Sequence, residues 1–241
     1  MIKFFKGLDR EHFVYRVLPH LMMELLRKYF RLEVEGLENV PRRGAAVIAP
    51  NHSGFAGFDA LLLAHTLYRD LKRVPRVLTH HFWFLTKTTA TAAQKIGFVD
   101  ATLENGISAL EKNNLMVIFP EGEEGNFKPT SEMYQLQEFK RGFIRMAIQT
   151  QSPIVPTLVI GAEESNINLS KLRFGKYLKG LVLPLPLNVV PLPVKWKIKF
   201  LPPIYLPYKP EQVHDRELMH EIADELRELM QEALSDELRK R

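Results

Sequence analysis

The alternation of short apolar runs with longer amphipathic segments restricts the fold more than any other feature of the sequence. Three runs carry no charge and have the length of buried strands: Ala45–Ala49, Leu115–Phe119 and Ile154–Ile160. Arg76–Thr79 is predicted to be a further strand. The intervening segments predict helices at Asp59–Tyr68, Phe82–Ile96, Leu103–Lys112 and Glu138–Gln149. This alternation indicates an α/β fold with a largely parallel sheet flanked by helices.

Both ends of the chain have helical patterns. Residues 1–34 contain an apolar stripe at helical spacing with basic residues nearby, which fits an amphipathic helix on a membrane surface and equally a helix packed on the core. Residues 210–241 predict a long amphipathic helix, Pro210–Arg239, so residues 35–209 form the α/β core of a single domain over 1–241. The stripe consists of Val14, Val17, Leu18, Leu21, Leu25 and Tyr29, widened by Met22, Leu26 and Phe30.

Two segments near the end of the core have patterns of their own. Val194–Leu201 alternates apolar and basic residues, which predicts a half-exposed strand near a sheet edge with its lysines in solvent. Gly180–Val194 carries no charge and several prolines. That composition fits a buried loop, and equally a segment that touches a bilayer or lines an acyl path.

Charge is distributed unevenly along the 241 residues, whose net charge is +5. Residues 211–241 have a net charge of −5, which leaves +10 on residues 1–210. A basic body suits an anionic partner, such as a phosphate-bearing substrate or an anionic membrane surface. Zinc-finger spacing and aromatic-basic ribonucleoprotein patterns are absent from the sequence, so no nucleic-acid partner is expected.

Several classes of protein are excluded by residues that the sequence lacks. There is no cysteine, so disulfides and thiolate nucleophiles are excluded. We find no secretory signal and no run of about 20 mostly apolar residues, and we expect a soluble or peripheral protein. His80 and His81 are adjacent, and no cysteine or carboxylate partner is expected for them, so no metal site is predicted.

Three groups of polar residues can carry chemistry. His52 follows the first apolar run and Asp59 opens the next predicted helix, so they can pair as a general base and its orienting carboxylate, or Asp59 can simply cap the helix. Phe119-Pro120-Glu121-Gly122 leaves a strand and either presents a carboxylate and backbone amides or is a plain turn. Lys140 and Arg141 open a predicted helix, where they can hold a phosphate or remain solvated.

Together these motifs resemble the glycerophospholipid acyltransferase family, which includes 1-acylglycerol-3-phosphate acyltransferases, and in particular a bacterial branch of it. The family has a His–Asp motif, a Gly-Phe-Ile/Val motif, Phe-Pro-Glu-Gly and an apolar strand with Val-Pro, in that order. The corresponding segments here, spanning residues 35–165, are Asn51-His52 to Asp59, Gly97-Phe98-Val99-Asp100, Phe119-Pro120-Glu121-Gly122 and Ile154-Val155-Pro156.

The sequence departs from the family pattern in three places. Six residues separate His52 from Asp59, where the family usually has four. Ala101 and Thr102 stand where an arginine is usual, and Glu123-Glu124 stand where many members have Thr-Arg. The familiar phosphate-binding arginines are therefore absent. Lys128, Lys140 and Arg141 are possible replacements, or the acceptor is not a lysophosphatidate.

The resemblance implies a glycerol-phosphate-acyltransferase-like fold and an O-acyltransferase of phospholipid biosynthesis. An acyl thioester donor, acyl-CoA or acyl carrier protein, would give its acyl group to a hydroxyl of a lysophospholipid acceptor. His52 would be the general base and Asp59 would orient it, without an acyl-enzyme. No metal and no cofactor beyond the thioester co-substrate is implied. Peripheral attachment to the cytoplasmic face of the inner membrane is expected. Substrate binding is expected of Asn51, Ser53, Phe119, Pro120, Glu121, Gly122, Lys128, Lys140 and Arg141.

Three alternatives remain from the sequence. The acceptor can be another lipid, such as a lyso-aminolipid or a glycolipid. The chain can be a non-catalytic lipid-binding protein that keeps the fold. It can also be a thioester hydrolase in which His52 and Asp59 activate water.

Overall fold

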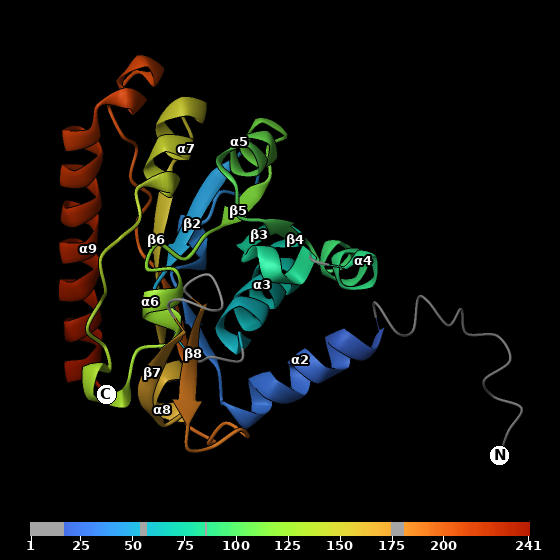
Figure 1. Cartoon of the computed structure of the whole chain (residues 1–241). Coiled ribbons are helices and arrows are strands. Elements are labelled where there is room, and N and C mark those ends of the chain that lie inside the picture. The colour runs from blue at the N-terminus through green and yellow to red at the C-terminus, as the bar shows by residue number, and fades with distance from the viewer. Residues whose placement is uncertain (1–16, 54–56, 85, 175–180) are drawn as a thin grey trace, which may run out of the picture.

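A seven-stranded sheet forms the centre of the protein, in the order β1-β9-β6-β2-β5-β3-β4 (Figure 1). The structure is a computed structural model that describes residues 17–53, 57–84, 86–174 and 181–241. Paired strands are parallel except β6 and β9, and a separate antiparallel pair joins β7 to β8. The strands are β1 Glu33–Glu35, β2 Ala46–Pro50, β3 Arg76–Thr79, β4 Phe98–Asp100, β5 Leu115–Val117, β6 Ile154–Ile160, β7 Asn168–Phe174, β8 Leu181–Pro186 and β9 Lys197–Phe200.

Helices cover both faces of this sheet, which is why its central strands are apolar throughout. Val47 and Ala49 of β2 face the core beneath α5, α7 and α9, whereas Ala46 and Ile48 face the core beneath α3 and α4 (Figure 1). The α-helices are α2 Leu18–Tyr29, α3 Phe58–Leu71, α4 Lys87–Lys95, α5 Leu103–Glu111, α6 Glu123–Asn126, α7 Gly142–Thr150, α8 Ala162–Ser165 and α9 Arg216–Arg239. The predicted fold class, including the long C-terminal helix, is confirmed.

Three predicted helices are divided or begin later in the structure. Phe82–Ile96 is divided into a 3-10 turn and α4, because the Thr86 side chain caps α4 by accepting the Thr89 backbone N–H. Pro210–Arg239 likewise divides at Asp215, whose carboxylate accepts two backbone N–H groups at the start of α9. Residues 138–141 are not helical.

Solvent exposure is predicted for the three lysines of Val194–Leu201, and the prediction is wrong for the two that lie in β9. Lys197 and Lys199 lie 3.0 Å and 2.8 Å from the carboxylate of Glu237, which belongs to α9 and is 6% exposed. Both also contact Glu35 of β1. These ion pairs fasten α9 and β1 to β9 at the edge of the sheet.

Helix α2 is amphipathic, and most of its apolar stripe is uncovered. Leu21 is 51% exposed, Leu25 is 67% exposed, and no residue of α2 is buried. Val14, which the sequence placed on the same stripe, lies outside the described residues. Among the helices described, none has the length and apolarity needed to span a bilayer.

Candidate active site

His52 and Asp59 are in direct contact at the carboxyl end of β2. The loop after β2 carries His52, and the first turn of α3 carries Asp59, so the two come from adjacent elements. Asp59 Oδ2 lies 2.6 Å from His52 Nδ1, and it also accepts the Ser53 backbone N–H at 3.0 Å. The Asp59 side chain is buried, whereas that of His52 is 15% exposed. Asp59 therefore fixes the imidazole through Nδ1 and leaves Nε2 for a substrate.

Glu121 holds the backbone of the histidine loop. Its Oε1 accepts the His52 N–H at 2.9 Å, and its Oε2 accepts the Gln137 N–H at 2.8 Å. Glu121 is 0% exposed. Both oxygens are thus used inside the protein, so this carboxylate positions His52 rather than facing a lipid headgroup.

The same contacts explain why the helix predicted at Glu138–Gln149 begins later, at Gly142. The Gln137 N–H is bonded to Glu121, and the Lys140 N–H donates to the Pro120 carbonyl at 2.8 Å. Residues 137–140 therefore lie alongside the Phe119–Gly122 segment and are not helical. This correction matters for the site because it brings Lys140 next to the turn at Gly122.

Two of the expected substrate-binding residues, Asn51 and Ser53, are buried at the end of β2. The Asn51 side chain donates to the Val159 carbonyl at 3.0 Å and accepts the Val159 N–H at 2.7 Å, which ties β2 to β6. Asn51 is 0% exposed and Ser53 is 1% exposed. Because Ser53 Oγ is buried beside the histidine, it is poorly placed to meet a substrate.

Phe119, Gly122 and Lys140 shape the accessible side of the site. The Phe119 ring stacks on the His52 ring with centroids 4.0 Å apart. Gly122 has φ +59° and ψ −143°, a conformation that side chains disfavour. A Cβ at this position would lie 2.7 Å from Lys140 Nζ, so the lysine ammonium rests against the turn that follows Glu121.

Lys128 lies in the interior, between two carboxylates. Its Nζ is 3.6 Å from Glu121 Oε2 and 3.0 Å from Glu163 Oε1, and its side chain is 3% exposed. Glu163 also accepts the Tyr134 backbone N–H at 2.7 Å. Burial raises the pKa of Glu163 to about 7, against the opposing effect of Lys128. Lys128 therefore neutralises buried carboxylates beneath the histidine loop.

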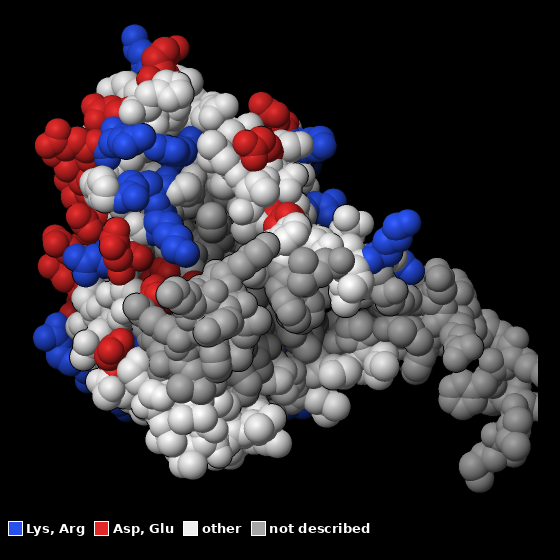
Figure 2. Space-filling model, viewed as in Figure 1, with Lys and Arg blue, Asp and Glu red and all other residues white. Residues whose placement is uncertain are grey.

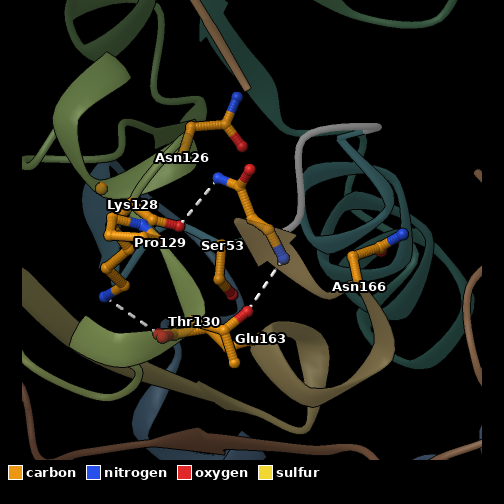
Figure 3. Close-up of a pocket in the computed structure, with 9 residues that line it drawn as sticks. Ser53, Asn126, Lys128, Pro129, Thr130, Glu163 and Asn166 are labelled. Carbon is orange, nitrogen blue, oxygen red and sulfur yellow. Dashed lines mark hydrogen bonds and ion pairs between the residues drawn. The ribbon is translucent and has the colours of Figure 1, made fainter. Parts of the chain in front are cut away.

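A small cavity of ≈ 20 Å³ lies beside these groups (Figure 3). Ser53 Oγ and Asn126 Oδ1 face buried surroundings and have no hydrogen-bond partner among the described residues. A space of roughly 10–15 Å³ on this scale accommodates one water, and such waters bond to otherwise unpaired polar groups. The cavity has the size and polarity for a bound water, and it is too small for a lipid headgroup.

Basic side chains gather over the start of α7, beside a hollow in the surface (Figure 2). Lys140 precedes the helix, Arg141 is its N-terminal flanking residue and Arg145 lies one turn further on. The Arg141 guanidinium contacts the imidazole of His220 on α9 and lies 3.8 Å from Glu138. This basic cluster is the part of the described surface near Gly122 that can attract an anion.

The two adjacent histidines do have carboxylate partners, contrary to expectation. His80 Nε2 lies 3.1 Å from Glu123 Oε1, and His81 Nδ1 lies 2.8 Å from Asp100 Oδ2. Each histidine thus pairs with a different carboxylate. A group of three potential metal ligands instead brings His20 and Glu24 of α2 to His65 of α3.

The structure thus brings His52, Asp59, Phe119 and Glu121 together and places Lys140 at the adjoining turn. Sequence reasoning missed Glu163. The one available signal was its place directly after β6, since strand ends hold the sites of parallel sheets. A partly exposed imidazole whose Nδ1 is held by a buried carboxylate can use its other nitrogen to remove a proton from a hydroxyl or from water.

Comparison with known proteins assigns this chain to a family. Residues 31–160 match the family model described as acyltransferase. An uncharacterized protein of Mycobacterium tuberculosis is 35% identical over 240 residues, which cover 92% of this chain and 66% of that protein. This chain therefore spans about two thirds of the length of its mycobacterial relative.

More distant relatives carry functional names. A "DGAT1/2-independent enzyme synthesizing storage lipids" of Gallus gallus is 29% identical over 76% of this chain and 54% of its own length. A 1-acyl-sn-glycerol-3-phosphate acyltransferase of Limnanthes alba is 26% identical over 72% of this chain and 54% of its own length. Among solved structures, a 1-acyl-sn-glycerophosphate acyltransferase of Thermotoga maritima has the same fold, with a TM-score of 0.59 and 16% identity over 98% of this chain and 85% of that one.

Proposed function

This chain belongs to the acyltransferase family, and from that premise we propose that it transfers a fatty acyl group from a thioester to a hydroxyl of a lysophosphatidate-like lipid. The observation that carries the proposal is the pairing of His52 Nδ1 with Asp59 Oδ2 at 2.6 Å. That pairing occupies Nδ1 and leaves the Nε2 lone pair of the partly exposed ring for a substrate. The name of the Limnanthes alba relative supports a lysophosphatidate-like acceptor.

In the proposed reaction His52 is the general base. Nε2 takes the proton of the acceptor hydroxyl, and the hydroxyl oxygen attacks the thioester carbonyl carbon. The Asp59 carboxylate stabilises the imidazolium that forms. The C–S bond then breaks, and the leaving thiolate takes the proton from Nε2. The products are an ester and a free thiol. A direct attack fits a chain without cysteine whose Ser53 hydroxyl is buried.

Lys140 is the cation that we expect to contact the acceptor headgroup. It lies against Gly122, on the accessible side of the turn that follows Glu121. Arg141 stands next to it and extends the positive surface toward α9. Lys128 is excluded from this role by its burial between Glu121 and Glu163. A lysine in place of the family's arginines also fits a different anionic lipid acceptor, because an ammonium lacks the bidentate geometry of a guanidinium.

The exposed apolar surface supports peripheral attachment to a membrane. Leu25 of α2 is 67% exposed, and Val189 and Val190, after β8, are 75% and 74% exposed. Tyr29 joins the two segments by donating a hydrogen bond to the Pro191 carbonyl at 2.7 Å. The lower part of Figure 2, over this end of the molecule, shows few charges. Apolar side chains of this kind insert at the level of lipid headgroups. We expect the cytoplasmic face of the inner membrane to be the site of attachment.

A substrate screen tests the transferase proposal. The purified chain would be incubated with acyl-CoA or acyl carrier protein thioester and a panel of lysolipids, and new lipid and free thiol would be measured by mass spectrometry. We expect acceptor-dependent product that falls about 10²–10⁴-fold in His52→Ala, the usual size of general-base catalysis. His214→Ala, an exposed histidine on another surface, is the matched control.

The other outcomes separate the alternatives. Thiol release without any acceptor would identify a hydrolase. A folded sample that forms no new lipid and releases no thiol with either donor, but still binds lipid, would identify a binding protein. Product formed equally by His52→Ala would refute the mechanism. For the membrane, flotation with anionic vesicles should decrease in Leu25→Asp and Val190→Asp, and unchanged flotation would rule out this surface.

A further inference from the structure

Three side chains with metal-binding chemistry meet where α2 lies against α3. His20 and Glu24 are four residues apart and therefore share one face of α2, and His65 approaches them from α3. We propose that His20, Glu24 and His65 form a zinc site that joins α2 to the body of the protein. The candidate ligand atoms, one from each side chain, all lie within 4.8 Å of one another.

The two separations that involve His65 are close to those of a tetrahedral site. Zinc lies 2.0–2.1 Å from histidine nitrogen and at similar distances from carboxylate oxygen, so two of its tetrahedral ligands are about 3.3 Å apart. His65 Nε2 is 3.1 Å from His20 Nδ1 and 3.6 Å from Glu24 Oε1. These two distances bracket the tetrahedral value. Two histidines and one glutamate are also a ligand set that zinc uses with water in the fourth position.

The hydrogen bonds in the structure do not use the full bonding capacity of the three candidate ligand atoms. Glu24 Oε1 is buried and has no hydrogen-bond partner among the described residues, although Arg69 Nε lies 3.3 Å away. His65 is 8% exposed, and its Nε2 faces a second imidazole nitrogen, so only one of that pair can donate a proton. A divalent ion would engage all three lone pairs at once.

The surrounding charges permit an ion at this position. Arg27 and Arg69 are the nearby cations, and both approach Asp70, at 4.0 Å and 3.7 Å. Arg27 also donates to Thr66 Oγ1 at 2.7 Å, which points it along α3. Arg69 is the direct competitor of a metal, because it shares Glu24 Oε1. Removing Arg69 should therefore strengthen metal binding.

A bound zinc would fix the orientation of α2. No residue of α2 is fully buried. Its attachment to the body of the protein consists of partly buried apolar side chains, Met23 and Leu26, and of polar contacts such as the Arg27–Thr66 hydrogen bond. A metal bridge would add coordination bonds between the two helices. The apolar stripe with Leu21 and Leu25 would then keep a constant direction relative to α3, whose first turn carries Asp59.

Cobalt and zinc binding to the full chain tests the proposal directly. The protein would be stripped with a chelator and titrated with Co²⁺, whose visible absorption reports tetrahedral coordination, and zinc would then compete it away. We expect a single ion per chain. Losing a ligand should weaken binding by at least the 10–100-fold that loss of an outer-shell partner costs. His20→Ala and Glu24→Gln are suitable variants because both positions are at least partly exposed.

Two further variants make the result decisive. His214→Ala removes an exposed histidine elsewhere and should leave the affinity unchanged, whereas Arg69→Gln should raise it. Absence of a tetrahedral cobalt spectrum would overturn the proposal. So would binding that persists in His20→Ala or Glu24→Gln, or binding that is lost equally in His214→Ala. Because the readout is metal affinity, its outcome is independent of acyl transfer.

Discussion

Replacing Lys128 with methionine removes the cation that two buried carboxylates share. Lys128 Nζ is 3.0 Å from Glu163 Oε1 and 3.6 Å from Glu121 Oε2, and the three side chains are 3%, 6% and 0% exposed. Removing one partner of a buried ion pair costs about 3–5 kcal/mol, because the remaining charge is left unpaired. The change in shape contributes less, since a volume-conserving substitution costs below about 1.5 kcal/mol. We therefore expect Lys128→Met to lose roughly 3–5 kcal/mol of folding free energy at pH 8.

The loss should depend on pH in a definite direction. Burial raises the pKa of Glu163 to about 7, above its value of 4.5 in the unfolded chain. The folded state therefore holds the proton more strongly, and stability falls as pH rises from 4.5 toward 7. Without Lys128 the folded pKa rises further, so the decline extends above pH 7. Lys128→Met should consequently be less destabilising at pH 5, where Glu163 is protonated, than at pH 8.

Urea denaturation followed by tryptophan fluorescence, to which buried Trp196 contributes, measures these differences. Lys112→Met, at an exposed position, is the control and should change stability by less than about 0.5 kcal/mol. Adding Glu163→Gln to Lys128→Met removes one unpaired charge and should restore part of the loss. A cost near that of a surface ion pair, below about 1 kcal/mol, would refute the reasoning. Equal losses at pH 5 and pH 8 would show that packing, and not charge, is responsible.

Three further substitutions test other parts of the structure. Asp59→Asn should keep the position of His52 but lower acyl transfer by about 10²–10⁴-fold, since the imidazolium loses its counter-charge; unchanged turnover would contradict this. Gly122→Ala should cost about 1–3 kcal/mol in thermal denaturation, because φ is +59° there, and a neutral result would mean that the turn relaxes. Glu237→Gln should cost up to about 3 kcal/mol at pH 7, because hydrogen bonds, chiefly from Lys199, lower the Glu237 pKa to about 2. That contribution is present above pH 4.5 and is lost as pH falls toward 2, so a difference between wild type and Glu237→Gln that persists at pH 2 would refute the assignment.

The central strands of the sheet could be predicted from the sequence, because a strand that is buried on both faces requires an uninterrupted apolar run. Arg76–Thr79 and Ile154–Ile160 have the predicted boundaries, and Ala45–Ala49 is shifted by a single residue. Strands β1 (Glu33–Glu35) and β4 (Phe98–Asp100) each combine few apolar residues with charged ones, so they carry too little pattern to stand out. The starts of the helices were harder to predict from the sequence. The start of α7 depends on hydrogen bonds from the segment before it to Pro120 and Glu121, which no local propensity records.

The candidate site was predictable where neighbouring elements supply both partners. His52 and Asp59 flank one strand-to-helix connection, and the structure joins them; their catalytic roles remain a prediction. The interior of the site was not predictable, because a charged residue in a sequence is normally assigned to solvent. Lys128 and Glu163 become buried only because each neutralises the other across 35 residues of chain, a compensation that appears only in three dimensions.

The position of β9 has a consequence for the synthesis of this chain on the ribosome. Strand β6 ends at Ile160, yet the partner on its open side, β9, begins only at Lys197. Strand β1 emerges far earlier and pairs with the same late strand. During translation the backbone edges of β1 and β6 that pair with β9 therefore remain unpaired until β9 is made. Unpaired strand edges favour pairing between nascent chains. We expect the nascent chain to need protection, by a chaperone or by rapid elongation, until residue 200 has left the exit tunnel.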